Sequence, residues 1–191
     1  MIHFDTTLTN LRRDVIRTFA VVDEWFDKED CLHRFKPPTG GWSTGEILEH
    51  ITLTSHYLLI LIDKGADKCM KLTNNETLAD ALRDYSFIHP KLEAIGEHKS
   101  FMWDRPEHME PTGAKPLADV RRDLRDQLDR CLCTLELLKN GEGVLYKTTM
   151  TVNDLGKLDV YQYIYFLSLH ARRHVTQMKA IEEEFNQALS H

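Results

Sequence analysis

The strongest constraint on this chain is a set of apolar stripes that repeat at steps of three and four residues. Such steps place side chains on one face of an α-helix, so each stripe predicts an amphipathic helix with a buried face. The first predicted helix covers residues 5–28, and its stripe consists of Leu8, Leu11, Val15, Phe19, Val22 and Phe26. Another predicted helix covers residues 117–139, and its stripe consists of Leu117, Val120, Leu124, Leu128, Cys131, Leu135 and Leu138.

Two further helices complete the pattern. Ser43 is followed three residues later by Glu46, directly before an apolar run, which is the capping box of a helix start. This helix is expected to run to Lys64, with Gly65 as its stop. The last helix is expected over residues 160–188. Its first residues favour a strand by propensity, but the helical spacing of apolar residues continues for many turns beyond them. That stripe continues through Leu167, His170, His174, Met178, Ile181 and Phe185.

These four helices predict an all-α chain whose 191 residues form one domain, an up-down four-helix bundle. A long irregular insert separates the second helix from the third. It is expected to hold a short helix over residues 76–88 and a loop over residues 97–114. A loop of this length is either functional or a structural segment that its aromatics, Phe101 and Trp103, pack over the bundle. Residues 144–153 have β propensity, which predicts an extended segment or a small hairpin.

Composition narrows the function classes. The net charge of −6 argues against a protein that binds nucleic acid or an anionic membrane surface. No apolar run is long enough to span a bilayer, and the first 25 residues carry charges that a signal peptide lacks. The cysteines form no CxxC pair, so reduced thiols and a cytoplasmic location are expected. They are Cys31, Cys69, Cys131 and Cys133.

Histidines are the unusual feature, with ten in the chain. His170 and His174 lie four residues apart, so they share one face of the last helix and can take adjacent positions on one metal ion. Both occupy stripe positions where an apolar residue is expected. Two inward imidazoles must be satisfied or cost several kcal/mol on burial. The pair therefore indicates a metal site, with a hydrogen-bonded histidine cluster as the metal-free alternative.

A third ligand is expected from the second helix, because metal sites in bundles are built from facing helices. His50 lies on the inward-leaning face of that helix and is the preferred candidate. His56 is the competitor, although it points about 120° away from His50 around the helix. The histidines expected to be solvated, in loops or at helix ends, are His33, His89, His98 and His108.

The residues around these histidines resemble a known family. The segment from Gly41 to Ile51 (GWSTGEILEHI), the segment GKLD at residues 156–159 and the run HARRHVTQM at residues 170–178 are similar to the DinB-like superfamily, in particular its YfiT-type branch. The resemblance covers residues 5–188. It implies a four-helix bundle with a three-histidine site for a divalent metal ion, described as nickel, zinc or iron. It assigns the ligand roles to His50, His170 and His174, and it implies a homodimer in many members.

The resemblance also implies two kinds of chemistry, because the family includes thiol transferases and proteins described as hydrolases. Three neutral imidazoles leave a bound metal with its positive charge and an open position for water or a thiol. Glu46 is expected either to act beside the metal or to be used up in the capping box. Gln177 is a candidate hydrogen-bond partner for a ligand. Arg172 and Arg173 are expected to face solvent or acidic neighbours, with anionic substrate as the alternative.

The sequence thus favours a cytoplasmic, metal-dependent enzyme of hydrolase or thiol S-transferase type. Zinc or nickel is the expected metal, with iron as a further candidate. A small-molecule substrate is expected, with a low-molecular-weight thiol as one candidate. No catalytic residue beyond the metal ligands is assigned. The alternative is a bundle that holds a metal without catalysis and serves a structural, sensing or dimerisation role.

Overall fold

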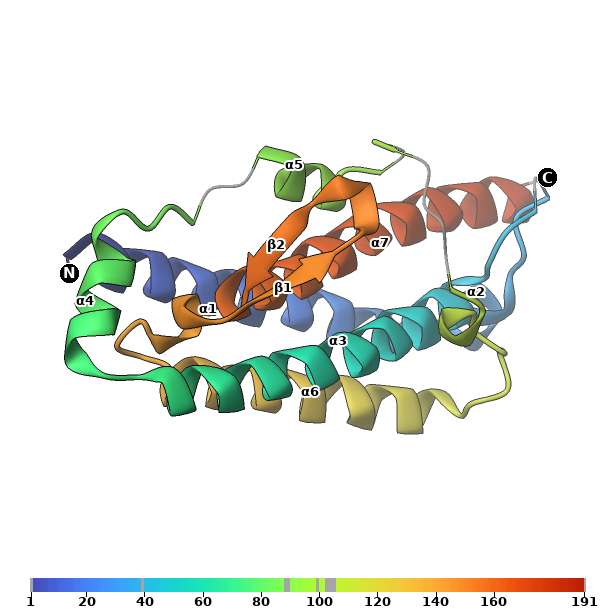
Figure 1. Ribbon diagram of the computed structural model, residues 1–191. Helices are drawn as coiled ribbons and strands as arrows, with labels where there is room; N and C mark the ends of the chain where they lie inside the picture. The colour runs from blue at the N-terminus through green and yellow to red at the C-terminus, as the bar shows by residue number, and fades with distance from the viewer. Residues whose placement is uncertain (1, 39, 88–89, 99, 102–105, 191) are drawn as a thin grey trace.

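The four apolar stripes lie on four long helices in the computed structural model, which describes residues 2–38, 40–87, 90–98, 100–101 and 106–190. They are α1 (Ile2–Glu24), α3 (Thr44–Leu72), α6 (Leu117–Leu137) and α7 (Val160–Leu189). The chain is mostly helical, and these helices lie lengthwise against one another (Figure 1). α1 and α3 each contact both α6 and α7. The site-bearing helices α3 and α7 are therefore neighbours, as expected.

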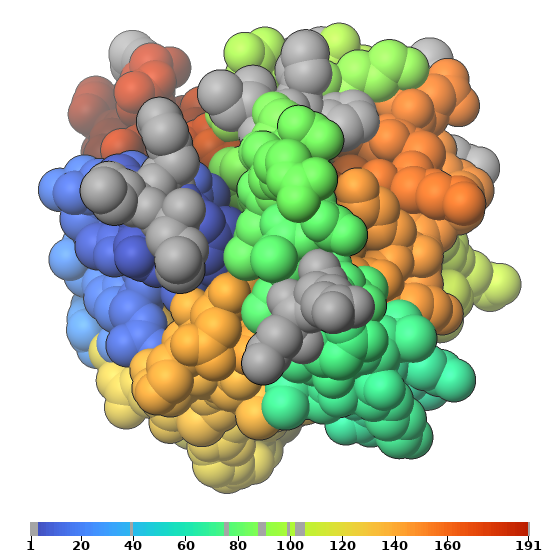
Figure 2. Space-filling model, turned by 60° about the vertical axis from the view of Figure 1, so that its left-hand side comes forward, coloured from blue at the N-terminus to red at the C-terminus, as the bar shows by residue number. Residues whose placement is uncertain are grey.

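The order of directions differs from the alternating up-down order that the sequence analysis predicted. α1 and α7 run one way along the molecule, whereas α3 and α6 both run the other way (Figure 1). The insert between α3 and α6 makes this possible, because it returns along the length of the helices before α6 begins. Seen from the end where α1 begins, the green surface of the insert separates α1 from the strands on the right (Figure 2).

The insert contains short elements where a 13-residue helix and a loop were expected. α4 (Asn75–Arg83) ends before the expected residue 88, α5 covers Pro90–Glu93, and 3-10 turns follow at Ala94–Gly96 and Glu107–Met109. Phe101 packs against the core, as expected for a loop that its aromatics hold against the helices. Trp103 and His89 lie outside the described residues.

Gly65 does not end its helix, so that prediction was wrong. α3 continues to Leu72, and Gly65 lies within it at a close approach to α7. A Cβ atom at Gly65 would lie 3.0 Å from Val160 Cγ2, so the missing side chain lets the start of α7 pack here. The helix accepts the cost of an internal glycine, about 1 kcal/mol relative to alanine, because tertiary packing offsets it.

The first predicted helix ends earlier in the chain than expected. α1 ends at Glu24 and is followed by a 3-10 turn, Trp25–Asp27, and by a short helix, α2 (Asp30–Arg34). The stripe nevertheless packs as predicted. Its buried members are Leu11, Val15, Phe19 and Val22, and Leu8 and Phe26 pack beside them.

Two antiparallel strands precede α7. β1 (Lys147–Met150) falls within the predicted extended segment, and β2 (Gly156–Asp159) is its partner, with Lys147 opposite Asp159. The connecting turn places Asn153 and Asp154 at positive φ, 50° and 49°, a backbone region that few residues other than glycine adopt. This turn lies at the cavity described below.

Both site-bearing helices begin with a capping box. Ser43 and Glu46 cap α3 as predicted, and Asp159 and Gln162 cap α7 in the same reciprocal way. Among the described residues, no helix is long and apolar enough to cross a membrane.

The cap of α7 generates a prediction about stability. Asp159 is fully buried, and burial raises the pKa of its carboxyl to about 6, despite a hydrogen bond from the Gln162 amide that lowers it. Because this pKa exceeds the ordinary value of 3.8, the folded state binds more protons than the unfolded state between these pH values. Ionisation of Asp159 therefore costs stability as pH rises through this range.

Asp159→Asn should keep the cap, since asparagine caps as well as aspartate, and should remove this cost. Relative to the native chain, its free energy of unfolding should rise by up to about 3 kcal/mol between about pH 4 and pH 7. Urea denaturation of both chains at several pH values measures this difference. Asp67→Asn, at an exposed position of α3, is the control. A difference that does not change with pH would contradict the prediction.

Candidate metal centre

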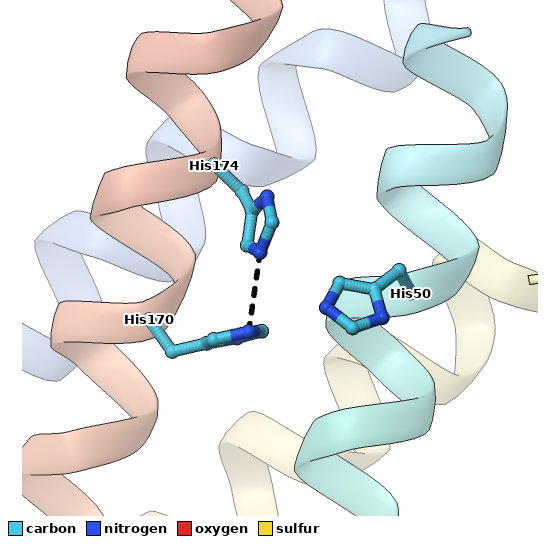
Figure 3. Close-up of side chains that lie close together, drawn as sticks. All are labelled: His50, His170 and His174. Carbon is cyan, nitrogen blue, oxygen red and sulfur yellow. Dashed lines mark hydrogen bonds between the residues drawn. The ribbon is translucent and has the colours of Figure 1, made fainter. Parts of the chain in front are cut away.

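Three histidines meet where α3 packs against α7. His50 lies in the second turn of α3, and His170 and His174 lie one turn apart on α7 (Figure 3). All three side chains are buried, with 2 to 4% of each residue exposed. The residues that the sequence analysis selected therefore come together, although they are separated by 120 positions in the chain.

The ring geometry fits a shared ion. The Nε2 atoms of His170 and His174 are 3.1 Å apart, and each of the three rings offers a nitrogen within 4.8 Å of the others. Two nitrogens bound at about 2.0–2.1 Å to one ion lie roughly 2.9 Å apart at a right angle and roughly 3.4 Å apart at the tetrahedral angle. The observed separation lies between these values, so the three-histidine group could hold a metal ion.

Hydrogen bonds at the outer nitrogens orient two of the rings. His50 Nδ1 lies 2.8 Å from the carbonyl oxygen of Met109. Because a carbonyl only accepts, Nδ1 carries the proton and the lone pair is on Nε2. His174 Nδ1 likewise donates to Gln177 Oε1 at 2.9 Å. Such outer partners are typical of metal-binding histidines, whose ring orientation they determine. Gln177 therefore contacts the site through His174.

The electrostatics of the group keep the rings of His170 and His174 neutral. Burial lowers the pKa of His170 and of His174 well below the ordinary value, and the neighbouring histidines and Arg173 lower both further. A neutral imidazole retains the lone pair that a metal ion requires. His170 and His174 are thus in the protonation state for metal binding near neutral pH.

The histidines form part of the wall of a cavity of about 1070 Å³. Its lining is mainly apolar and includes Trp42, Leu58, Phe101, Met150 and Phe166. Met150 and the neighbouring turn from residue 151 to 154 bring the β1–β2 hairpin to the cavity. A cavity of this size admits a small organic molecule beside the three rings.

Arg173 and His98 also line this cavity, which corrects two expectations. Arg173 was expected to face solvent or acidic neighbours, but it is only half-exposed and faces the site. Its neighbour Arg172 is exposed, and its Nη2 atom lies 3.8 Å from Oε2 of Glu93. His98 was expected to be solvated but is partly buried at the cavity. No periodic pattern could have indicated His98, because it lies in the irregular insert.

Three further histidines among the described residues do not belong to the cluster. His56 is exposed, so it is no competitor for the third position. His108 is exposed as expected and packs edge-on against Tyr57. His33 was expected to be solvated but is buried. Its Nε2 donates to the carbonyl oxygen of Trp25 at 2.9 Å, which offsets part of the cost of burying the ring.

Glu46 serves the capping box rather than the histidine cluster. Its carboxylate accepts from the Ser43 amide at 2.7 Å and from Lys36 Nζ at 2.6 Å. Burial would raise the pKa of Glu46, but these hydrogen bonds outweigh it and lower that pKa. The neighbouring carboxylate of Glu49 is buried and binds the insert, a role that no sequence pattern indicated.

Comparison with known proteins shows the family of this chain. The chain matches the family model of the DinB superfamily over residues 12–178, and it belongs to that superfamily. It is similar to a protein of Bacillus subtilis (strain 168) named "Uncharacterized protein YuaE", with 28% identity over 161 residues. That alignment covers 80% of this chain and 85% of the relative. No solved structure gives a significant match.

The geometry predicts that His50 and His56 differ in their effect on metal binding. His50→Ala should weaken binding of zinc or nickel strongly, because one of three converging ring nitrogens is lost. His56→Ala should leave binding unchanged, because this ring lies on the exposed face of the same helix. Competition with a chromophoric chelator measures both affinities. Equal effects of the two substitutions would contradict the assignment.

Proposed function

We propose that this chain is a metal-dependent enzyme of hydrolase or thiol S-transferase type. In this proposal His50, His170 and His174 hold a divalent ion, with zinc or nickel preferred and iron as a further candidate. The four long helices would act as a four-helix bundle that holds the ligands rigidly. The observation that carries the proposal is a cluster of three buried imidazoles whose rings form part of the wall of a large cavity.

The number of ligands favours catalysis over a structural role. Within the described residues, the metal-binding group consists of three histidines. Structural zinc sites are closed by four protein ligands, whereas catalytic sites keep a position for water or substrate. A divalent ion held there would lower the pKa of a bound water or thiol and so supply a nucleophile near neutral pH. The cavity provides room for the molecule attacked.

The chain's own residues would orient and bind. Met109 and Gln177 hold the rings of His50 and His174 at their outer nitrogens. The apolar walls would take the body of a small-molecule substrate and exclude water from it. Arg173 supplies a positive charge beside the histidines, which favours a substrate with an anionic group. A low-molecular-weight thiol with a carboxylate meets these requirements.

A second candidate function is a metal-binding helical protein with a structural, sensing or dimerisation role. The depth of burial of the three rings favours it, because a metal ion enclosed by the protein would contribute to folding directly.

A homodimer and a cytoplasmic location are further proposals. The resemblance supports the first. The four free cysteines, two of them exposed, support the second, because such thiols persist in reducing compartments.

Metal removal separates the two functions. If the site is catalytic, a chelator should abolish hydrolysis or thiol transfer to an electrophile and shift the melting temperature by only a few degrees. Metal content, activity and melting temperature should be measured together, for the native chain and for His174→Ala. The substitution should leave the fold intact, because its cost of about 1–3 kcal/mol lies within the usual stability of a domain. Unfolding on chelation would support the structural role instead.

The proposed anionic substrate makes Arg173 and Arg172 a matched pair. Arg173→Met should raise KM for a substrate with a carboxylate by roughly 10- to 100-fold, because a charge-assisted hydrogen bond contributes about 1.5–3 kcal/mol. Arg172→Met should leave KM unchanged, since Arg172 is exposed and lies outside the cavity lining. Steady-state kinetics with a neutral and an anionic thiol tests this. Equal losses for both thiols would contradict a role in binding charge.

A further inference from the structure

A segment of the insert is fastened to α3 beside the histidine cluster. We call residues 109–113 the strap. Its contacts with α3 begin at Glu49, next to His50 in the chain, and end at Thr54, one turn further along. The strap is thus attached along the same stretch of helix that carries the His50 ring.

Glu49 makes most of these contacts. Its side chain is buried, and its carboxylate accepts three hydrogen bonds from the strap. Thr112 donates to Oε1 from its amide at 3.2 Å and from its hydroxyl at 2.9 Å, and the Gly113 amide donates to Oε2 at 2.7 Å. A buried carboxylate is costly unless such donors satisfy it, so these bonds hold the strap firmly in one position.

Glycine is required at the end of this attachment. Gly113 has a φ of +68°, and a Cβ atom there would lie 3.3 Å from Glu46 Oε1. Both amides that bind Glu49 precede this torsion in the chain, so the positive φ determines the direction in which the chain leaves the attachment. A side chain at this position would strain the backbone directly after the two bonds to Glu49.

The other end of the strap reaches the histidine cluster. The carbonyl oxygen of Met109 accepts the Nδ1 proton of His50, and Thr54 Oγ1 lies 4.0 Å from Met109 Sδ. Free histidine side chains have no partner that selects Nδ1 protonation. In this chain the Met109 carbonyl makes that selection, and it leaves the His50 Nε2 lone pair for the cluster.

We propose that Glu49 is a positioning residue for His50. It holds the strap so that the Met109 carbonyl keeps His50 protonated at Nδ1 and its Nε2 directed at the shared metal position. This inference rests on the proposed metal site, but the protonation of His50 in the metal-free chain tests it separately. The alternative is that Glu49 only stabilises the fold by fastening the insert.

The test compares substitutions at both ends of the attachment with a control elsewhere on α3. Glu49→Ala removes all three acceptor contacts, and Glu49→Gln keeps one acceptor oxygen. Thr112→Val removes a hydroxyl donor from the strap without changing α3. Gln127→Ala is the control, because buried Gln127 on α6 donates to the Thr52 carbonyl at 2.9 Å and, in the described part of the chain, makes no hydrogen bond to the strap or the cluster.

Two readouts distinguish positioning from simple stabilisation. Nitrogen-15 shifts of the His50 ring, measured by NMR on metal-free protein, report which nitrogen carries the proton. Zinc affinity, measured by chelator competition, reports the effect on the cluster. Glu49→Ala should shift His50 towards Nε2 protonation and weaken zinc binding about 10- to 100-fold. Glu49→Gln and Thr112→Val should give smaller changes in the same direction, and Gln127→Ala should give neither.

Each remaining outcome decides the proposal. If His50 stays protonated at Nδ1 in Glu49→Gln and Thr112→Val, the strap does not depend on Glu49 and the proposal is wrong. The same holds if Gln127→Ala alters the ring as much as the strap variants do. Should the native chain bind no zinc or nickel, the proposed function fails, whereas the NMR comparison still decides whether Glu49 positions His50.

Discussion

Packing of α3 against α7 buries three imidazole rings at one point, and much of the molecule serves to satisfy them. Buried polar groups without partners are costly, so each ring requires an arrangement that accounts for both of its nitrogens. The Met109 carbonyl and the Gln177 side chain take the outer nitrogens of two rings. The inner nitrogens face one another at a distance that suits a shared ion. The site is thus a consequence of helix packing combined with outer hydrogen bonds.

The insert between α3 and α6 has two functions in this arrangement. Because α3 and α6 run in the same direction, the chain must return along the molecule between them (Figure 1). On that return it supplies Phe101 to the core and the strap to the histidine cluster. A connection that topology requires therefore also forms part of the site. Its attachment through a buried glutamate explains how an irregular segment can hold a carbonyl in a defined place.

The cavity beside the cluster combines groups from distant parts of the chain. Trp42 comes from the segment before α3, the hairpin contributes Met150, and α7 contributes Arg173. The lining combines apolar side chains with charged groups of both signs, because Asp154 of the hairpin turn lies at the cavity as well as Arg173. All of these lining residues fall within residues 12–178, the range that matches the superfamily.

The sequence by itself determined the four helices, the capping box at Ser43 and the three histidines, because helical periodicity and capping act over a few neighbouring residues. Only the tertiary structure decided that α3 continues through Gly65, since close packing against Val160 offsets the glycine's cost. It likewise decided the parallel course of α3 and α6 and the partners of His50. These features depend on contacts between distant segments, for which a single sequence carries no local signal. Glu49 and Met109 illustrate this, because nothing in their sequence neighbours indicates the distant segment that each one contacts.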